Sequence, residues 1–216
     1  GEEATYVALA VACACLVMVL LLDSWLAPFV FLASIGVAIL LNMGSNYFLG
    51  EISYITKALA AVLQLAVTMD YSIFLWHSYC EQLATQEDHK KAMAEAIART
   101  ITSVTGSSIT TIAGFIALCF MSYTMGRDLG IVMAKGVVLG VLGSVTILPA
   151  MILLLDKPLQ KTRHRALLPN LHQLSRGIVK HAWVFLVIFA VLLVPAAVGY
   201  SRTPVFYDFT KIFSSE

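Results

Sequence analysis

Long apolar blocks separated by short polar segments dominate this chain. Six blocks stand out, namely Tyr6–Leu22, Trp25–Leu41, Tyr54–Tyr79, Ile101–Ser122, Leu129–Leu155 and Trp183–Tyr200. At ~1.5 Å per residue, a helix of each length crosses a hydrocarbon core of roughly 30 Å, the first two blocks only just. The pattern therefore predicts an all-α membrane protein, a polytopic bundle with about six transmembrane helices.

The composition agrees with this pattern. Hydrophobic residues make up 59% of the sequence and charged residues 12%, whereas soluble domains average roughly 45–50% apolar and about 25% charged residues. The shortage of charge carries the greater weight, because a soluble protein of this size needs charged residues on its surface. We expect a multi-pass protein of the cell membrane, with the lipid bilayer as its surroundings.

The basic residues predict the orientation. Nine of the 14 Lys and Arg residues fall in two connecting segments, 80–100 and 156–181. Cytoplasmic loops carry an excess of Lys and Arg, so these two segments are predicted to be cytoplasmic and both chain ends extracytoplasmic. The segment 87–100 is polar on one face and apolar on the other, which predicts a short amphipathic helix on the cytoplasmic surface. The segment 157–181 is interpreted as a basic cytoplasmic linker.

One carboxylate lies inside an apolar block. Asp70 follows Lys57 by 13 residues and precedes His77 by seven, so in a helix it lies ~20 Å and ~10 Å from them. A charge near the middle of a membrane is costly, by at least ~2.5–3.5 kcal/mol on insertion scales, and such residues usually serve a transport pathway. An apolar environment favours the neutral carboxyl form, so a carboxyl group at this depth can take up and release a proton. A protonated, purely structural Asp70 is the alternative.

Polar side chains accompany Asp70. Gln64, Thr68 and Tyr71 follow one another at helical spacing, and the block that begins at Ile101 is rich in hydroxyl groups. Small hydroxyl residues allow close helix packing and hydrogen bonds between helices. We predict that Ser107, Ser108 and Thr111 support the Asp70 site, with helix packing alone as the alternative.

The fifth block holds a packing motif and a cation. Gly136 and Gly140 form a G-x-x-x-G pair, which favours close helix contact. Lys135 lies eight residues after Arg127, ~12 Å into the membrane. Its ammonium group either reaches back to the outer surface or pairs with a carboxylate inside the bundle.

Other chemistries lack support in the sequence. There is no clustered set of His and carboxylate residues for a metal, no G-x-x-x-x-G-K-[ST] loop for ATP, and no nucleophile in a catalytic context. We therefore expect neither an enzyme nor a cofactor, and no nucleic-acid partner. The chain also lacks an initiator Met and a signal peptide, and it is interpreted as an internal piece of a longer protein.

Four segments together resemble one family. The segment 66–74, Ala-Val-Thr-Met-Asp-Tyr-Ser-Ile-Phe, resembles the Asp-Tyr motif in the fourth transmembrane helix of the resistance-nodulation-division (RND) superfamily. The segments 92–97 and 107–115 are similar to the cytoplasmic helix and the fifth transmembrane helix. Asp128-Leu129-Gly130, with the glycine-rich block that ends at Leu148-Pro149-Ala150, resembles the sixth. The most similar branch is the MmpL-like transporters.

The resemblance implies an architecture. Residues 1–156 would hold helices two to six of a twelve-helix protein, 182–201 helix seven, and 202–216 the start of a second extracytoplasmic domain. Asp70 and Tyr71 would be proton-relay residues, protons the coupling ion, and Gly114 a helix-packing glycine. The partners would be a lipid or other hydrophobic substrate and the second half of the same polypeptide. A homo-oligomer is compatible with this reading.

Two other functions use the same helices. A sterol-sensing-like module would bind lipid between its helices and regulate another process, without moving protons. A helper of protein export built on the same fold would be distinguished by its extracytoplasmic domains. Transport that depends on Asp70 separates the proton-driven exporter from the sterol-sensing-like module.

Overall fold

The structure is a computed structural model that describes residues 2–49, 52–121, 124–164 and 172–202. The chain divides into two compact units, Gly1–Leu167 and Leu168–Glu216. Within the described residues the structure is helical, apart from an isolated antiparallel bridge between Ser24 and Arg163. The all-α membrane bundle expected from the sequence is therefore confirmed.

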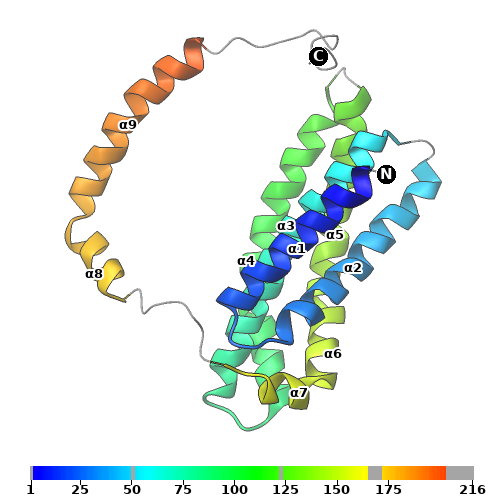
Figure 1. Ribbon diagram of the computed structural model, residues 1–216, viewed down its shortest axis with the longest axis vertical. Coiled ribbons are helices and arrows are strands. Elements are labelled where there is room, and N and C mark those ends of the chain that lie inside the picture. Colours follow the sequence, from blue (N-terminus) through cyan, green and yellow to red (C-terminus); the bar gives the residue numbers. More distant parts are fainter. Residues whose placement is uncertain (1, 50–51, 122–123, 165–171, 203–216) are drawn as a thin grey trace. The chain divides into compact units, whose positions relative to one another are not determined.

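The first unit contains seven α-helices and one short 3-10 helix among its described residues (Figure 1). These are α1 (Glu2–Leu21), α2 (Ala27–Ser45), η1 (Asn46–Leu49), α3 (Tyr54–Leu83), α4 (His89–Leu118), α5 (Thr124–Val145), α6 (Ile147–Leu154) and α7 (Asp156–Lys161). The long helix α3 packs against α1, α2, α4 and α5. Asp70 lies near the middle of α3 and therefore about halfway along the bundle.

The packed interior lies at the end of the bundle where α3 ends and α4 begins. Trp76 and Tyr79 of α3 lie there with Phe31 of α2 and Met93 of α4, and all four are buried. Burying a large apolar side chain contributes roughly 1.5–3 kcal/mol. This cluster therefore fixes one end of the α3–α4 pair.

The amphipathic segment near 87–100 is not a separate surface helix, and that prediction is wrong. It is the first part of α4, which continues without interruption to Leu118. Asp88 caps the helix by accepting hydrogen bonds from the backbone N–H groups of Lys90 and Lys91. No proline occurs between Arg99 and the end of α4 at Leu118. The apolar face of the segment packs into the buried cluster that contains Trp76 and Tyr79 of α3. Nothing local therefore ends the helix at the membrane boundary.

The predicted fifth block, in contrast, is interrupted. Helix α5 ends at Val145, Thr146 departs from helical geometry with φ −115° and ψ −62°, and α6 begins at Ile147. Pro149 explains the break, because a proline has no N–H group for the carbonyl four residues earlier and its ring crowds that carbonyl. Helix α7 follows after Leu155 and lies at the same end of the unit as the α3–α4 connection (Figure 1).

Five segments of the described chain are long and apolar enough to cross a membrane, namely Ala27–Phe48, Ile55–Leu83, His89–Leu118, Gly126–Leu154 and Ala182–Arg202. The first predicted block, Tyr6–Leu22, corresponds to α1, whose apolar part, Thr5–Leu20, is shorter than these spans. Only 11% of the α4 span is buried, against 39% of the α3 span. One long face of α4 is therefore open.

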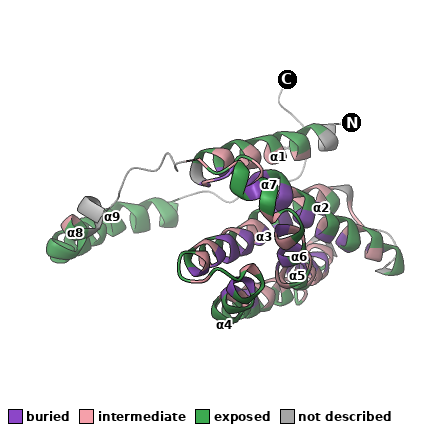
Figure 2. Ribbon diagram, turned by 90° about the horizontal axis from the view of Figure 1, so that it is seen from below, coloured by how far each residue is buried: buried purple, intermediate pink, exposed green. Residues whose placement is uncertain are grey.

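The second unit contains α8 (His172–Lys180) and α9 (Ala182–Arg202) within its described part. Helix α9 matches the predicted block at 183–200 and is exposed along its whole length (Figure 2). The linker predicted at 157–181 therefore includes α7 and α8, and 165–171 lies outside the described residues. The extracytoplasmic domain predicted to begin at 202 also falls outside them, from residue 203 onward.

Candidate functional site

Asp70 lies near the middle of α3. It is 16 residues from Tyr54 and 13 from Leu83, the ends of the helix, which are ~24 Å and ~20 Å along its axis. Its side chain is exposed, and no hydrogen bond or ion pair to it occurs within the described residues. Ionisable groups within membrane helices usually pair with another group or face a water-filled cavity.

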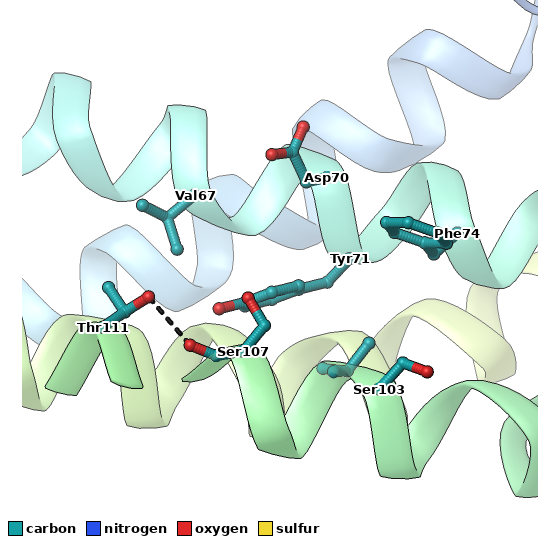
Figure 3. Close-up of a pocket in the computed structure, with 8 residues that line it drawn as sticks. Val67, Asp70, Tyr71, Phe74, Ser103, Ser107 and Thr111 are labelled. Carbon is teal, nitrogen blue, oxygen red and sulfur yellow. Dashed lines mark hydrogen bonds between the residues drawn. The ribbon is translucent and has the colours of Figure 1, made fainter. Parts of the chain in front are cut away.

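A pocket of about 340 Å³ lies beside Asp70, between α3 and α4 (Figure 3). Helix α3 contributes Val67, Asp70, Tyr71 and Phe74, and α4 contributes Ser103, Val104, Ser107 and Thr111. The walls are mainly apolar, with hydroxyl groups from α4. The Asp70 carboxylate points away from these hydroxyl groups (Figure 3). Such a surface can hold a few water molecules or a polar side chain of a neighbouring helix.

The Tyr71 side chain closes the inner wall of this pocket. Its hydroxyl lies 2.8 Å from Ser108 Oγ, which in turn lies 2.6 Å from the Val104 carbonyl. The serine hydroxyl has one proton. When it donates to Val104, it accepts from Tyr71, so the tyrosine ring is fixed against α4. The structure thus joins Ser108 to Tyr71, which lines the pocket with Asp70, and the supporting role of Ser108 stays a prediction.

Ser107 and Thr111 also lie at the pocket. The Thr111 hydroxyl donates to the Ser107 carbonyl at 2.9 Å, one turn earlier in the same helix (Figure 3). A threonine hydroxyl often bonds back to its own helix in this way, and its remaining lone pairs stay available. Ser103, which sequence reasoning did not single out, lines the same pocket. Its position four residues before Ser107 is the signal that places both on one face.

Gln64 and Thr68 face a different part of the bundle. The Gln64 amide donates to the Gly136 carbonyl at 3.1 Å, and its oxygen accepts from Asn42 at 2.8 Å. Thr68 packs against Gly140. Both side chains are buried between α2, α3 and α5, so the structure separates them from the Asp70 pocket. Their contacts belong to helix packing.

The G-x-x-x-G pair makes this packing feasible. A Cβ atom on Gly136 would lie 2.6 Å from Asn42 Nδ2, and one on Gly140 would lie 2.4 Å from Thr68 Oγ1. Gly114 differs, because a Cβ there would meet nothing within 4 Å in the described structure. Gly130, which the sequence did not single out as a packing residue, lies against the backbone of Phe115 in α4. The small residues that bring α5 against its neighbours are thus Gly130, Gly136 and Gly140.

The Lys135 side chain extends toward the C-terminal end of α2. Its ammonium group donates to the Asn42 carbonyl at 3.1 Å and to the Asn46 side chain. Asn46 begins η1, where α2 ends, so the side chain extends to the helix end, as a lysine near a membrane surface does. No carboxylate of the described residues lies within ion-pair distance of it. Lys135 is therefore remote from the Asp70 pocket.

Asn42 is a buried polar residue that sequence reasoning missed. Its amide nitrogen bonds both Gln64 and the Val132 carbonyl, joining α2, α3 and α5. The available signal was an amide directly after the apolar block that ends at Leu41. Among the described residues, no group of three His, Cys, Asp or Glu side chains is arranged to hold a metal ion.

A second polar cluster joins the turn before α2 to the segment after α7. The Asp23 carboxylate accepts from Trp76 Nε1 at 2.8 Å and pairs with Arg163 at 2.6 Å. Burial by itself would raise the pKa of Asp23, but these two partners outweigh it and lower the pKa below its usual value. The cluster therefore holds a charged carboxylate at this end of the first unit.

Comparisons with known proteins show which family this chain is similar to. The model of the MMPL family matches residues 1–199. ActII-3, a membrane protein of Streptomyces coelicolor, is 28% identical over 138 residues, which is 62% of this chain and 19% of the relative. The siderophore exporter MmpL5 of Mycobacterium tuberculosis is 28% identical over 159 residues, 70% of this chain and 16% of the relative.

MmpL12 of the same organism is 26% identical over 143 residues, 64% of this chain and 12% of the relative. The chain thus spans at most about a fifth of the length of these three relatives. No solved structure matches it. Because the family model covers nearly the whole chain, this protein belongs to the MMPL family.

Proposed function

We propose that this chain is part of an RND-type membrane transporter that uses proton entry to export lipids or other hydrophobic molecules. In this proposal Asp70 binds and releases the coupling proton, and Tyr71 shapes its surroundings. Membership of the MMPL family and the similarity to a protein named as a siderophore exporter support transport. The role of the proton rests on the residues themselves.

The single observation that carries the proposal is the exposed Asp70 carboxylate near the middle of α3, beside a pocket with hydroxyl groups and with no hydrogen bond or ion pair to the described residues. A buried structural carboxyl group would be hydrogen-bonded. A carboxyl group that exchanges protons needs instead an open side and polar groups that can order water. Ser103, Ser107 and Thr111 provide such groups at the pocket wall.

The open face beside Asp70 suggests where the rest of the protein binds. We infer that helices from the second half of the polypeptide cover α3 and α4 there and supply the group that Asp70 lacks. Protonation would remove the negative charge and so change how tightly the two halves attract one another. Two protonation states would then favour two packings of the halves, which is the basis of a transport cycle.

The test uses the full-length protein in vesicles with an imposed pH gradient. Proton flux is followed with a pH-sensitive dye, and export with a fluorescent lipid. We expect Asp70→Asn to lower both activities at least tenfold, because the amide cannot release a proton. Asp70→Glu, which retains a titratable group, should keep part of the activity. Asp70→Asn with full proton-coupled transport would overturn the proposal.

Two controls make this result interpretable. Glu95→Gln removes an exposed carboxylate from α4, outside the pocket, and should leave transport unchanged. Lipid binding by the Asp70→Asn variant should be measured in parallel. Wild-type protein that binds lipid but moves no protons would favour the regulatory, sterol-sensing-like function instead.

A further inference from the structure

Helix α8 is a short helix that leads directly into a membrane-spanning one. It covers the nine residues His172–Lys180, and α9 begins at Ala182. His181 joins them, with its backbone N–H bonded to the Gly177 carbonyl. Because α9 is long and apolar enough to cross a membrane, the last turn of α8 lies at the boundary between lipid and water.

The two sides of α8 differ in chemistry. Arg176 and Lys180 are four residues apart, so they lie on one side of the helix. Ile178 is two residues from each, a rotation of about 200°, and therefore points the opposite way. All three side chains are exposed. A basic side opposite an apolar side is the pattern of a helix that lies in the membrane interface.

Such a helix needs a surface to be stable. Isolated helices shorter than roughly 12–15 residues are marginal in water, and α8 has nine residues with Ile178 43% and Val179 76% exposed. In the described part of its unit, α9 is the one other helix. The bilayer that α9 enters would offer Ile178 an apolar surface.

The surrounding charge is of one sign. Residues 157–181 contain six Lys or Arg residues and no Asp or Glu. Arg176 and Lys180 therefore have no acidic residue nearby along the chain. Clusters of basic residues next to a transmembrane helix attract anionic lipid headgroups, while their alkyl stems remain at the apolar boundary.

We propose that α8 lies on the membrane surface and binds anionic phospholipids, with Arg176 and Lys180 contacting the headgroup phosphates and Ile178 inserted among the acyl chains. Binding at this site would hold the start of α9 next to anionic phospholipids. This inference depends on α9 crossing the membrane and not on the proposed proton-driven transport. It therefore stands or falls independently of the Asp70 experiment.

The test measures the depth of α8 in the membrane. A spin label is placed at Ile178→Cys in the full-length protein after replacement of its native cysteines, and its accessibility to oxygen and to a water-soluble nickel chelate is compared. Vesicles contain phosphatidylcholine alone or with increasing phosphatidylglycerol. We expect the label to enter the oxygen-accessible apolar region as phosphatidylglycerol is added.

Removing the two charges should reverse this effect. In Arg176→Gln/Lys180→Gln, the affinity for phosphatidylglycerol should fall roughly 30-fold, since each basic residue near the surface contributes about fivefold. Lys90→Gln/Lys91→Gln, which removes two exposed lysines from the first turn of α4, should leave the depth of Ile178 unchanged. A label that stays in water, or that is equally deep with and without phosphatidylglycerol, would overturn the proposal.

A second measurement needs no cysteine substitution. Hydrogen–deuterium exchange of residues 176–180 in the wild-type protein should slow in nanodiscs that contain phosphatidylglycerol, relative to phosphatidylcholine alone. Equal exchange in both lipids would contradict the proposal even if the labelled variant failed to fold.

Discussion

Gly130 and Gly114 both lie in helices, but only Gly130 packs closely against another helix. Single substitutions to alanine test this difference. A Cβ atom on Gly130 would lie 2.6 Å from the Phe115 carbonyl oxygen, a backbone atom that cannot move alone. We expect Gly130→Ala to lower the free energy of unfolding by about 1–3 kcal/mol, measured by denaturation of the 216-residue chain in detergent micelles.

Gly114→Ala is the matched control for Gly130→Ala, because the space around its Cβ is open. It should be neutral or stabilising by up to ~1 kcal/mol, owing to the better helix propensity of alanine. If both variants lost the same stability, the close contact between α4 and α5 at Gly130 would be contradicted. The comparison therefore separates packing from the general effect of removing a glycine.

At the scale of elements, the turn between α1 and α2 is joined to the segment after α7. Asp23 contacts Trp76 and Arg163, Ser24 Oγ donates to the Leu159 carbonyl, and the backbones of residues 24 and 163 form a bridge. These contacts link three separate parts of the sequence at one end of the bundle. Each of them is polar, so apolar periodicity alone does not reveal them.

The lowered pKa of Asp23 has a consequence for stability at acid pH. A carboxyl group with a lower pKa in the folded state stabilises the protein above its unfolded value of about 3.9, and this contribution is lost as the pH falls through the folded value. We expect Asp23→Asn to reduce stability by about 1–2 kcal/mol at pH 7 and by much less near pH 2, where the wild type has lost the same interaction.

Thermal unfolding at both pH values measures this effect. The control is Glu81→Gln, an exposed residue near the same end of the bundle with no ion pair in the described structure, and it should change stability little at either pH. A difference between Asp23→Asn and wild type that stayed constant with pH would show that the lost contact is not electrostatic.

At the scale of the whole molecule, the open face of α3 and α4 is the feature to be tested in the full-length protein. Phe74 beside Asp70 is 61% exposed, and Leu40 on α2 is 72% exposed. If the second half of the polypeptide covers the Asp70 face, a spin label at Phe74→Cys should be several-fold less accessible to oxygen from the lipid than one at Leu40→Cys. Equal accessibility would mean that lipid, not protein, faces Asp70.

The membrane helices and the central candidate residue follow from the sequence by itself. Apolar blocks of sufficient length become helices because the bilayer leaves no other partner for their backbone groups. The bilayer also offers no partner for a charged side chain, so a carboxylate such as Asp70 is unusual in such a block. The sequence therefore predicts one site from the Asp70–Tyr71 pair and the hydroxyl groups of the next block. The structure places Asp70, Tyr71, Ser107 and Thr111 at one pocket.

Only the tertiary structure decided how these elements pair. Gln64 and Thr68 are near Asp70 in sequence, but Thr68, two residues before Asp70, is rotated by about 200° around α3, and both side chains contact α5. The partners of Lys135, Asn42 and Asn46 at the end of α2, likewise depend on a contact between distant segments. The sequence determined which segments enter the membrane and which residue carries the charge, whereas packing determined which groups surround it.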